Sequence, residues 1–507
     1  MKRHALVAAL VAAFGISAAA QPLDRLGAAL SSVEGQQAQP PVTLGPPQTK
    51  AEGTVLKNKA PVNKELLRVK LPKPTELDLS NGVHLIVLED HRTPQVNFQM
   101  IIDGAGGYYD PASASGLATS TATLMREGTT TKTSEQISEQ LDRLAAAVGV
   151  TAGSATPFAT VNGNGLTNNL DTVLGLMADV LMNPAFPQVE IDRFKARQKA
   201  FLTQNRSQPG FLAQERLSKA VYGDHPLSRV ASTPEAVDAL NRDALVEFHK
   251  THYVPNAAVL AVTGDITPEQ AKQKAEAAFG AWKKSDTAVP AQTAPAPISG
   301  PSISLVARDK SVQTSLRVGT QSIERTDPDY EELTVANRIL GGPFGRLFEH
   351  LREQKGYTYG ANSGFSATRF RGAWNASTDV RSEVTDPALT DLIDEIRQMR
   401  DTPIVDKELA DMKRAIVAGF ARTLENPEVL LNNYIDSYQY KLPADYWDTY
   451  PARIEAITVD DVQRVAKKYW TPARLQIVAV GDRAKVEPAL KKLGNVTVYD
   501  ADGKVIQ

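Results

Sequence analysis

One segment in the first half of this chain reads Gly116-Leu117-Ala118-Thr119-Ser120-Thr121-Ala122-Thr123-Leu124-Met125-Arg126-Glu127-Gly128-Thr129. We expect a short helix between its two glycines, with Thr119 and Thr123 four residues apart on one helical face. Pairs of ligating side chains at this spacing can grip one metal ion, but threonine hydroxyls are poor zinc ligands. Ala122 between them cannot accept a proton. On their own residues, these three positions therefore cannot build a zinc site.

A second segment, in the other half, reads Gly341-Gly342-Pro343-Phe344-Gly345-Arg346-Leu347-Phe348-Glu349-His350-Leu351-Arg352-Glu353-Gln354-Lys355-Gly356-Tyr357-Thr358-Tyr359-Gly360. Gly356 is well placed to end a helix, which puts Arg352 on the last helical turn. Tyr359 then falls on the strand that follows. A guanidinium and a phenol can donate hydrogen bonds to a peptide carbonyl and to the oxyanion formed when water attacks it.

The two halves of the chain read as repeats of one another. Each ends in a proline, an apolar strand, a Gly-Asp pair and a helix, at an offset of 217 residues, as from Pro255 to Pro472. The other matching positions are Gly264-Asp265 with Gly481-Asp482, and Tyr253 with Trp470. A repeat of this length indicates two copies of one folding unit.

Strands gather near the ends of each half, and helices fill the middle. We expect strands over residues 83–88, 96–102, 258–262, 303–306, 314–318 and 475–480, and helices over 134–148, 170–182 and 189–205. This pattern predicts an α+β fold of two homologous α/β sandwich domains, each a mostly antiparallel sheet with helices packed on it. A Pro/Ala-rich linker joins them.

The predicted divisions are a signal peptide over 1–20, an extended or disordered lead-in over 21–70, domains over 71–285 and 300–507, and the linker over 286–299. The signal peptide rests on a basic start, an apolar run and small residues before position 21. No later stretch is long and apolar enough for a membrane span. We therefore expect export, into the periplasm.

Composition excludes several classes of protein. The chain has 507 residues, 56 basic and 58 acidic, and a net charge of −2 at pH 7. A nucleic-acid binder usually carries a basic excess or stripe, and neither is present. There are no cysteines, which excludes disulfides, thiolate metal sites and cysteine nucleophiles.

The first segment resembles the signature of the pitrilysin/insulinase family of zinc metallopeptidases, which includes the mitochondrial processing peptidase. That signature reads Gly-Leu-Ala-His-x-x-Glu-His-Met, followed by Gly-Thr after the helix. The framing residues Gly116, Leu117, Ala118, Gly128 and Thr129 stand at the expected spacing. The resemblance runs from about residue 70 to 495.

The resemblance implies that the catalytic zinc machinery is missing from this chain. The two histidine positions hold Thr119 and Thr123, and the position of the general base holds Ala122. The family's third ligand is a glutamate on a later helix, and the matching residues 194–204 contain no carboxylate. His249 and His252 alone among the histidines have a helical spacing that could share one face, and we interpret them as structural or surface residues. We expect no metal and no cofactor in this chain.

The second segment resembles the family's C-terminal domain motif, in which an arginine and a tyrosine seven residues later reach across to the zinc site. Arg352 and Tyr359 fall on those positions. On spacing alone, a surface arginine and a sheet-packing tyrosine would be the simpler interpretation. The repeat and the surrounding residues of the family motif favour the functional interpretation of Arg352 and Tyr359 instead.

Some members of this family work as heterodimers in which one subunit carries zinc and its companion carries the arginine–tyrosine pair. The resemblance implies that this chain is the companion, inactive alone. Its expected partners are a homologous subunit with His-x-x-Glu-His, which holds the zinc, and an unstructured peptide substrate. Two alternatives remain: a peptide-binding, chaperone-like protein without a catalytic partner, and a scaffold subunit of the same fold.

Overall fold

The computed structural model describes residues 67–286 and 289–506. The predicted signal peptide and nearly all of the predicted lead-in lie outside the described residues. None of the helices that the structure describes combines the length and the apolar character that a membrane crossing needs.

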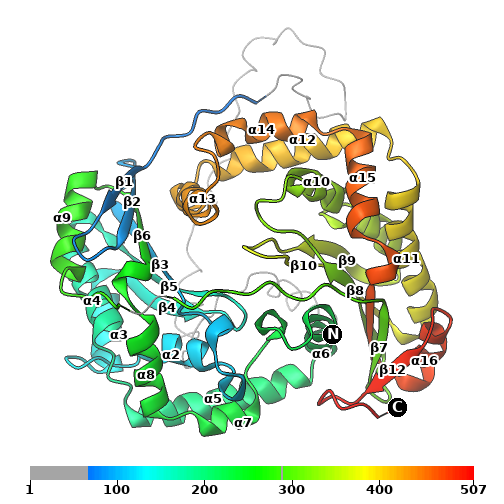
Figure 1. Ribbon diagram of the computed structural model, residues 1–507, viewed down its shortest axis with the longest axis horizontal. Coiled ribbons are helices and arrows are strands. Elements are labelled where there is room, and N and C mark those ends of the chain that lie inside the picture. The colour runs from blue at the N-terminus through cyan, green and yellow to red at the C-terminus, as the bar shows by residue number, and fades with distance from the viewer. Residues whose placement is uncertain (1–66, 287–288, 507) are drawn as a thin grey trace, which may run out of the picture. The chain divides into compact units, whose positions relative to one another are not determined.

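Two mixed sheets of six strands form the framework (Figure 1). The first has the order β1-β2-β6-β3-β5-β4 and the second β12-β7-β11-β8-β10-β9. Neighbouring strands are antiparallel except for the pairs β2–β6, β7–β11 and β7–β12. The strands are β1 Thr75–Asp78, β2 His84–Glu89, β3 Gln95–Asp103, β4 Ala147–Ala152, β5 Phe158–Leu166, β6 Ala258–Gly264, β7 Ser302–Ala307, β8 Gln313–Gln321, β9 Thr358–Phe365, β10 Ala373–Arg381, β11 Gln476–Gly481 and β12 Val496–Tyr499.

Helices cover these sheets, so the predicted α+β sandwich is confirmed. They are α2 Leu117–Met125, α3 Ser134–Leu144, α4 Leu170–Met182, α5 Gln188–Arg206, α6 Pro209–Tyr222, α7 Pro234–Ala239, α8 Arg242–His252, α9 Pro268–Phe279, α10 Tyr330–Gly341, α11 Thr385–Asp401, α12 Asp406–Thr423, α13 Pro427–Tyr440, α14 Tyr446–Ala456, α15 Val459–Tyr469 and α16 Arg483–Lys491. The repeat is visible in β6 and β11, which take the third place in their sheets and are buried at every position. Continuous apolar runs of this kind suit central strands.

Two helices pack on the sheet of the other half, and we call α6 and α13 the exchanged helices. Helix α6 precedes the linker but buries Leu212, Leu217 and Val221 against Val306, Val478 and Val480 of the second sheet. Helix α13 buries Leu430, Leu431, Tyr434 and Ile435 against Ile86, Ile101 and Val259 of the first sheet. Figure 1 shows α6 beside the second sheet and α13 beside the first. Each half therefore depends on a helix supplied by the other.

The helix expected over 134–148 is wrong beyond Leu144. Helix α3 ends there because Ala145 takes a left-handed conformation with φ 48°. The chain then enters β4, in which Val148 and Val150 alternate inward at 4% and 6% exposure. Alternation with a period of two marks a strand.

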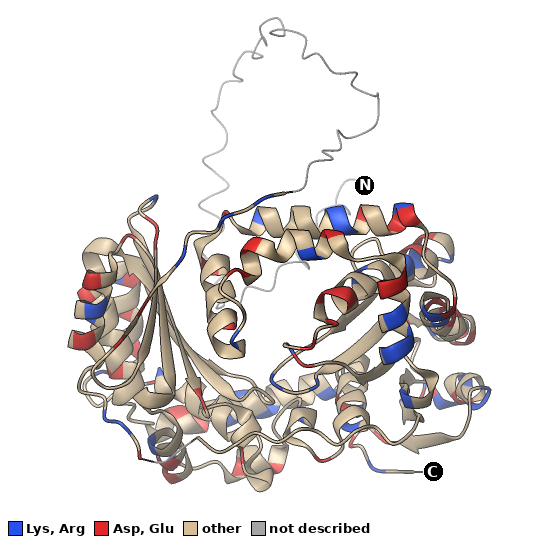
Figure 2. Cartoon of the chain, turned by 45° about the horizontal axis from the view of Figure 1, so that its top comes forward, with Lys and Arg blue, Asp and Glu red and all other residues tan. Residues whose placement is uncertain are grey.

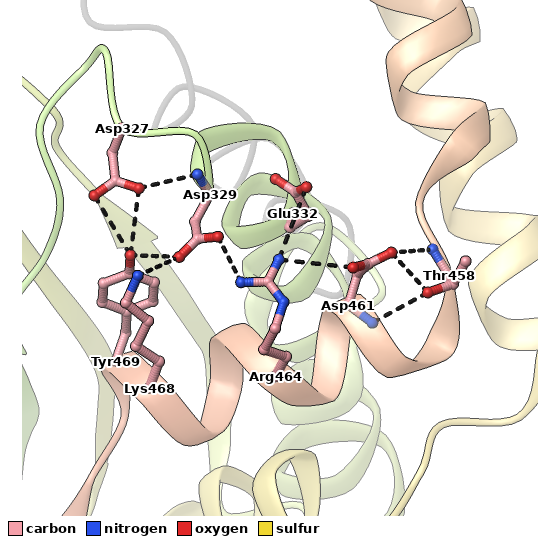
Figure 3. Close-up of polar contacts among 8 residues, drawn as sticks. All are labelled: Asp327, Asp329, Glu332, Thr458, Asp461, Arg464, Lys468 and Tyr469. Carbon is pink, nitrogen blue, oxygen red and sulfur yellow. Dashed lines mark hydrogen bonds and ion pairs between the residues drawn. The ribbon is translucent and has the colours of Figure 1, made fainter.

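Charged residues gather on helices and loops, with few on the strands of either sheet (Figure 2). One charged cluster, centred on the buried carboxylate of Asp329, fastens the start of α10 to α15 (Figure 3). Asp329, only 5% exposed, accepts hydrogen bonds from Arg464 at 2.5 Å, Lys468 at 2.6 Å and Tyr469 at 2.7 Å. Burial raises the pKa of Asp329, but these hydrogen bonds outweigh it and hold the pKa at about 2.

Candidate functional site

Helix α2 begins at a position that only glycine fits. Gly116 has φ 92°, and a Cβ added there would lie 2.5 Å from the Cβ of Ser232. The Asp110 carboxylate accepts hydrogen bonds from the backbone N–H groups of Gly116 at 2.6 Å and Ala118 at 2.8 Å. Burial raises the pKa of Asp110 to about 6, against the opposing effect of these hydrogen bonds. The frame residues therefore fix where α2 starts.

The three positions predicted as a degenerate zinc motif lie on α2 and do not fit a metal. The Thr119 hydroxyl donates to the Ala152 carbonyl at 3.0 Å, and the Thr123 hydroxyl donates to the Thr119 carbonyl at 2.8 Å. Ala122 is packed in the core with no exposed surface. Both hydroxyls are occupied by backbone acceptors, and threonine is in any case a poor zinc ligand. Among the described residues, no group of three or more His, Asp or Glu side chains could hold a metal ion.

Residues 194–204, matched to the family's third ligand, lie on α5, which packs against α2. Gln198 donates a hydrogen bond to the Ser232 hydroxyl at 3.2 Å. Ser232 is also the residue that crowds Gly116. The middle of α5 thus lies beside the start of α2, and it presents an amide there.

His249 and His252, the one histidine pair with helical spacing, lie near the end of α8 and are both packed into the fold. The Nε2 atom of His249 lies 2.7 Å from the Leu181 carbonyl oxygen, and burial lowers the pKa of this histidine. His252 stacks on Phe248 with ring centroids 4.2 Å apart. These contacts agree with a structural role.

Arg352 lies on a π-helix, η7, which spans Phe348–Gln354. Gly356 follows with φ 62°, and its N–H donates to the Arg352 carbonyl at 3.0 Å, as expected of a glycine that ends a helix. The Arg352 guanidinium lies 4.6 Å from the centroid of the Phe348 ring, and its Nε lies 3.5 Å from the Glu353 carboxylate. With 44% of the side chain exposed, the guanidinium is open to a binding partner.

Tyr359 lies on β9, and a β-bulge turns it out of the sheet. Thr378 of β10 stands opposite Ala361, whereas Val380 stands opposite Thr358, so β9 carries one extra residue. The Thr378 hydroxyl donates to the Gly360 carbonyl at 3.1 Å and stabilises the bulge. Bulges re-aim side chains in this way. Tyr359 is 93% exposed as a result.

Arg352 and Tyr359 therefore lie on consecutive elements, on either side of the Gly356 turn, and both are exposed. The degenerate motif lies on α2 of the first half, so the two sets of predicted site residues belong to different sheets (Figure 1).

Sequence reasoning missed the aromatic surface beside Arg352. Phe344 is 81% exposed, and its ring meets Phe348 edge to face at 5.6 Å. Together with Arg352, Glu349 and Glu353, these rings line a surface pocket. The sequence signal for this exposed ring was the glycine-rich segment around Phe344, which predicts a turn. In the structure Phe344 has φ 61° there.

A cavity of about 1690 Å³ opens between residues of the two sheets. Aromatic side chains contribute much of its wall, namely Tyr108, Phe158, Tyr222, Phe365, Phe370, Tyr434, Tyr438 and Tyr440. Arg352, Tyr359 and the three motif positions of α2 are not among the described residues that line it. The cavity is large enough for a peptide segment.

Two family models match the chain. The first, described as insulinase (peptidase family M16), matches residues 85–235, and the second, described as the peptidase M16 inactive domain, matches residues 239–416. Together they account for well over half of the sequence.

Curated relatives are named as zinc proteases. The chain is 24% identical over 348 residues to an uncharacterised zinc protease, YmxG, of Bacillus subtilis, covering 68% of this chain and 83% of that protein. It is 25% identical over 358 residues to another uncharacterised zinc protease of Streptomyces coelicolor, covering 68% and 76%.

Solved structures share the fold. A peptidase M16 inactive domain from Pseudomonas fluorescens aligns with TM-score 0.74 and 26% identity, covering 81% of this chain and 98% of that one. The periplasmic protease PqqL from Escherichia coli aligns with TM-score 0.70 and 15% identity, covering 86% and 48%.

Proposed function

Because this chain belongs to the peptidase M16 (insulinase/pitrilysin) family, we propose that it is the zinc-less subunit of a two-chain metallopeptidase. A homologous partner with an intact His-x-x-Glu-His would carry the metal centre. This chain would contribute Arg352 and Tyr359 to the joint site. Neither of the chain's own site positions, Thr119 and Thr123, offers a metal ligand.

The observation that carries the proposal is the exposure of Arg352 and Tyr359 in a chain whose own α2 positions, Thr119 and Thr123, offer no metal ligand. At 44% and 93% exposure, the guanidinium and the phenol can reach a substrate held by another chain. The guanidinium would hold the scissile carbonyl, and the phenol would donate to the oxyanion that forms when water attacks. Each such donor contributes about 10²–10³-fold to turnover in other hydrolases.

The edge strands of the two described sheets support an extended peptide as the substrate class. Strands β4 and β9 each pair on one side only, at the ends of the described sheets. An extended peptide could add to such an edge by main-chain hydrogen bonds, which favours unstructured peptides. The basic start and apolar run of the first 20 residues support export to the periplasm.

A peptide-binding, chaperone-like protein is the second candidate, because the aromatic cavity could hold a peptide without any cleavage. A scaffold subunit is less well supported, since a scaffold has no need of an exposed Arg352 and Tyr359.

Co-expression tests the proposal directly. The chain and a homologue with an intact His-x-x-Glu-His are each produced alone and then together. Each preparation is assayed with unstructured fluorogenic peptides. We expect hydrolysis only from the pair, with stoichiometric zinc in the partner. If this chain alone binds stoichiometric zinc and cleaves peptides, the proposal is wrong.

Substitutions in the pair test the assigned roles. Arg352→Ala or Tyr359→Phe should lower kcat by about 10²–10³-fold, because each removes one hydrogen-bond donor, and should leave the partner's zinc content unchanged. The matched controls are Arg397→Ala, at a residue 62% exposed on α11, and Tyr499→Phe on β12. Unchanged turnover in both Arg352→Ala and Tyr359→Phe would remove their proposed role.

A further inference from the structure

The helix that carries Arg352 is irregular, and its orientation needs support from outside. π-Helices are rare and occur mostly as single turns near functional sites. Helix η7 is one such segment, bounded by the left-handed Gly356. A short element of this kind is oriented by its tertiary contacts more than by its own backbone.

His350 provides a polar contact of this kind. Its Nδ1 lies 2.7 Å from the Glu395 carboxylate of α11, and its Nε2 lies 3.8 Å from the Asp391 carboxylate, also on α11. Glu395 is only 6% exposed. A charge-assisted hydrogen bond of this length is among the stronger polar contacts, and a buried carboxylate without a donor is costly.

Two basic side chains flank the His350–Glu395 contact. The Arg346 guanidinium forms two hydrogen bonds with Glu408, at 2.6 and 2.7 Å, and also lies close enough to Glu395 to interact electrostatically. Lys355, just after η7, lies 3.9 Å from Asp391. The segment before η7 is thus tied to α12 through Arg346, and η7 itself and its end are tied to α11 through His350 and Lys355, with His350 making the shorter contact.

Hydrophobic packing already attaches η7 to the core without His350. Leu347 and Leu351, on either side of it, have no exposed surface. A polar pair in such a place contributes little net stability, because its desolvation offsets its attraction. What it fixes is the rotation of η7 about its axis, which keeps Arg352 on the outer face while Leu351 stays in the core.

We infer that His350 and Glu395 are positioning residues for Arg352, an inference that rests on the proposed function of Arg352. The His350–Glu395 contact holds η7 at the rotation that presents the guanidinium outward. Without it, η7 keeps its apolar anchor but loses a defined rotation. A displacement of about 1 Å at a catalytic group can cost about 100-fold in rate.

The test combines kinetics of the two-chain complex with hydrogen–deuterium exchange of this chain. His350→Ala should lower kcat by about 100-fold with little change in KM and in partner zinc, and should speed exchange across residues 348–354. His350→Gln keeps a side-chain N–H that can donate to Glu395, so it should recover most of the lost turnover. Asp329→Asn is the matched control, because it removes a buried carboxylate that forms ion pairs in the same half, and it should leave kcat unchanged.

The outcomes separate this inference from the proposed function. If the unmodified complex cleaves peptides and His350→Ala keeps its kcat, the inference is wrong and the proposed function stands. If the unmodified complex is inactive, the proposed function fails. Hydrogen–deuterium exchange alone then tests whether the His350–Glu395 contact holds η7 on α11. Unchanged exchange across 348–354 in His350→Ala overturns the inference in either case.

Discussion

Ala122 stands where the family places a general base, yet its side chain is packed in the core with no exposed surface. Thr123, the next residue, points into solvent. Of these two neighbouring positions on α2, Ala122 is therefore buried and Thr123 is exposed to solvent. Introducing a carboxylate at each of these two positions in turn should have very different effects on stability.

Ala122→Glu should destabilise the protein by about 3–5 kcal/mol, because it buries a carboxylate that has no partner. Thr123→Glu, on the exposed side of the same helix, should change the free energy of unfolding by no more than about 0.5 kcal/mol. Denaturant unfolding of both variants provides the comparison. Equal effects would show that the base position is open to solvent.

Gly356 is the other residue whose backbone determines the site. With φ 62°, it separates Arg352 from Tyr359, and a Cβ added there would meet no atom within 4 Å. Gly356→Ala should therefore cost only the conformational penalty, about 1 kcal/mol, whereas Gly356→Asn should cost less because asparagine tolerates this conformation. Thermal unfolding measures both. A loss of several kcal/mol in Gly356→Ala would indicate a steric clash instead.

Among the elements, the contact of α10 with α15 depends most on charge. The Asp329 carboxylate has a folded-state pKa of about 2 and an ordinary value of 3.8. Its hydrogen bonds therefore contribute stability that is present above the ordinary value and is lost as the pH falls toward 2. The contribution is about 2 kcal/mol at most, because Arg464 and Lys468 remain about half exposed.

Asp329→Asn should be less stable than the unmodified protein at pH 7 by about that amount, and the difference should shrink as the pH falls from 5 to 2. Urea unfolding at a series of pH values measures it. Asp171→Asn, which removes a surface partner of Lys274, is the control and should change little. A difference between Asp329→Asn and the unmodified protein that grows on acidification would contradict the assignment.

Helices and strands were predictable from sequence where one hydrophobic periodicity dominates the segment. The helix expected over 170–182 has the bounds of α4, and the repeat correctly located β6 and β11. The expected helix over 134–148 overran because Val148 also falls on the helical period of Leu141 and Leu144. The tertiary pairing of β4 with β5 decides the structure there.

The fine structure of the candidate site was not predictable. The sequence indicated Arg352, Tyr359 and a helix that ends before Gly356. The π-helical form of η7 and the bulge at Tyr359 depend on contacts with residues distant in sequence, such as Glu395 and Thr378. No local pattern encodes those contacts.

At the scale of the whole molecule, the exchanged helices bind the two halves together. Residues 1–286 produced alone should aggregate, because the apolar side of α6 would lose the second sheet. Residues 289–507 produced in the same cells should rescue them as a soluble pair, which co-purification can detect. Leu217→Asp, at a residue 1% exposed on α6, should abolish the rescue. Two separately soluble, monomeric fragments would contradict this prediction.

The exchanged helices also limit which parts of the gene can be deleted without loss of the fold. A shorter gene that kept only the half with Arg352 and Tyr359 would still encode both residues of the proposed pair. Such a gene would leave the second sheet without α6, and the apolar surface of Val306, Val478 and Val480 uncovered. Each half thus covers an apolar surface of its neighbour, and deletion of either half should destabilise the other.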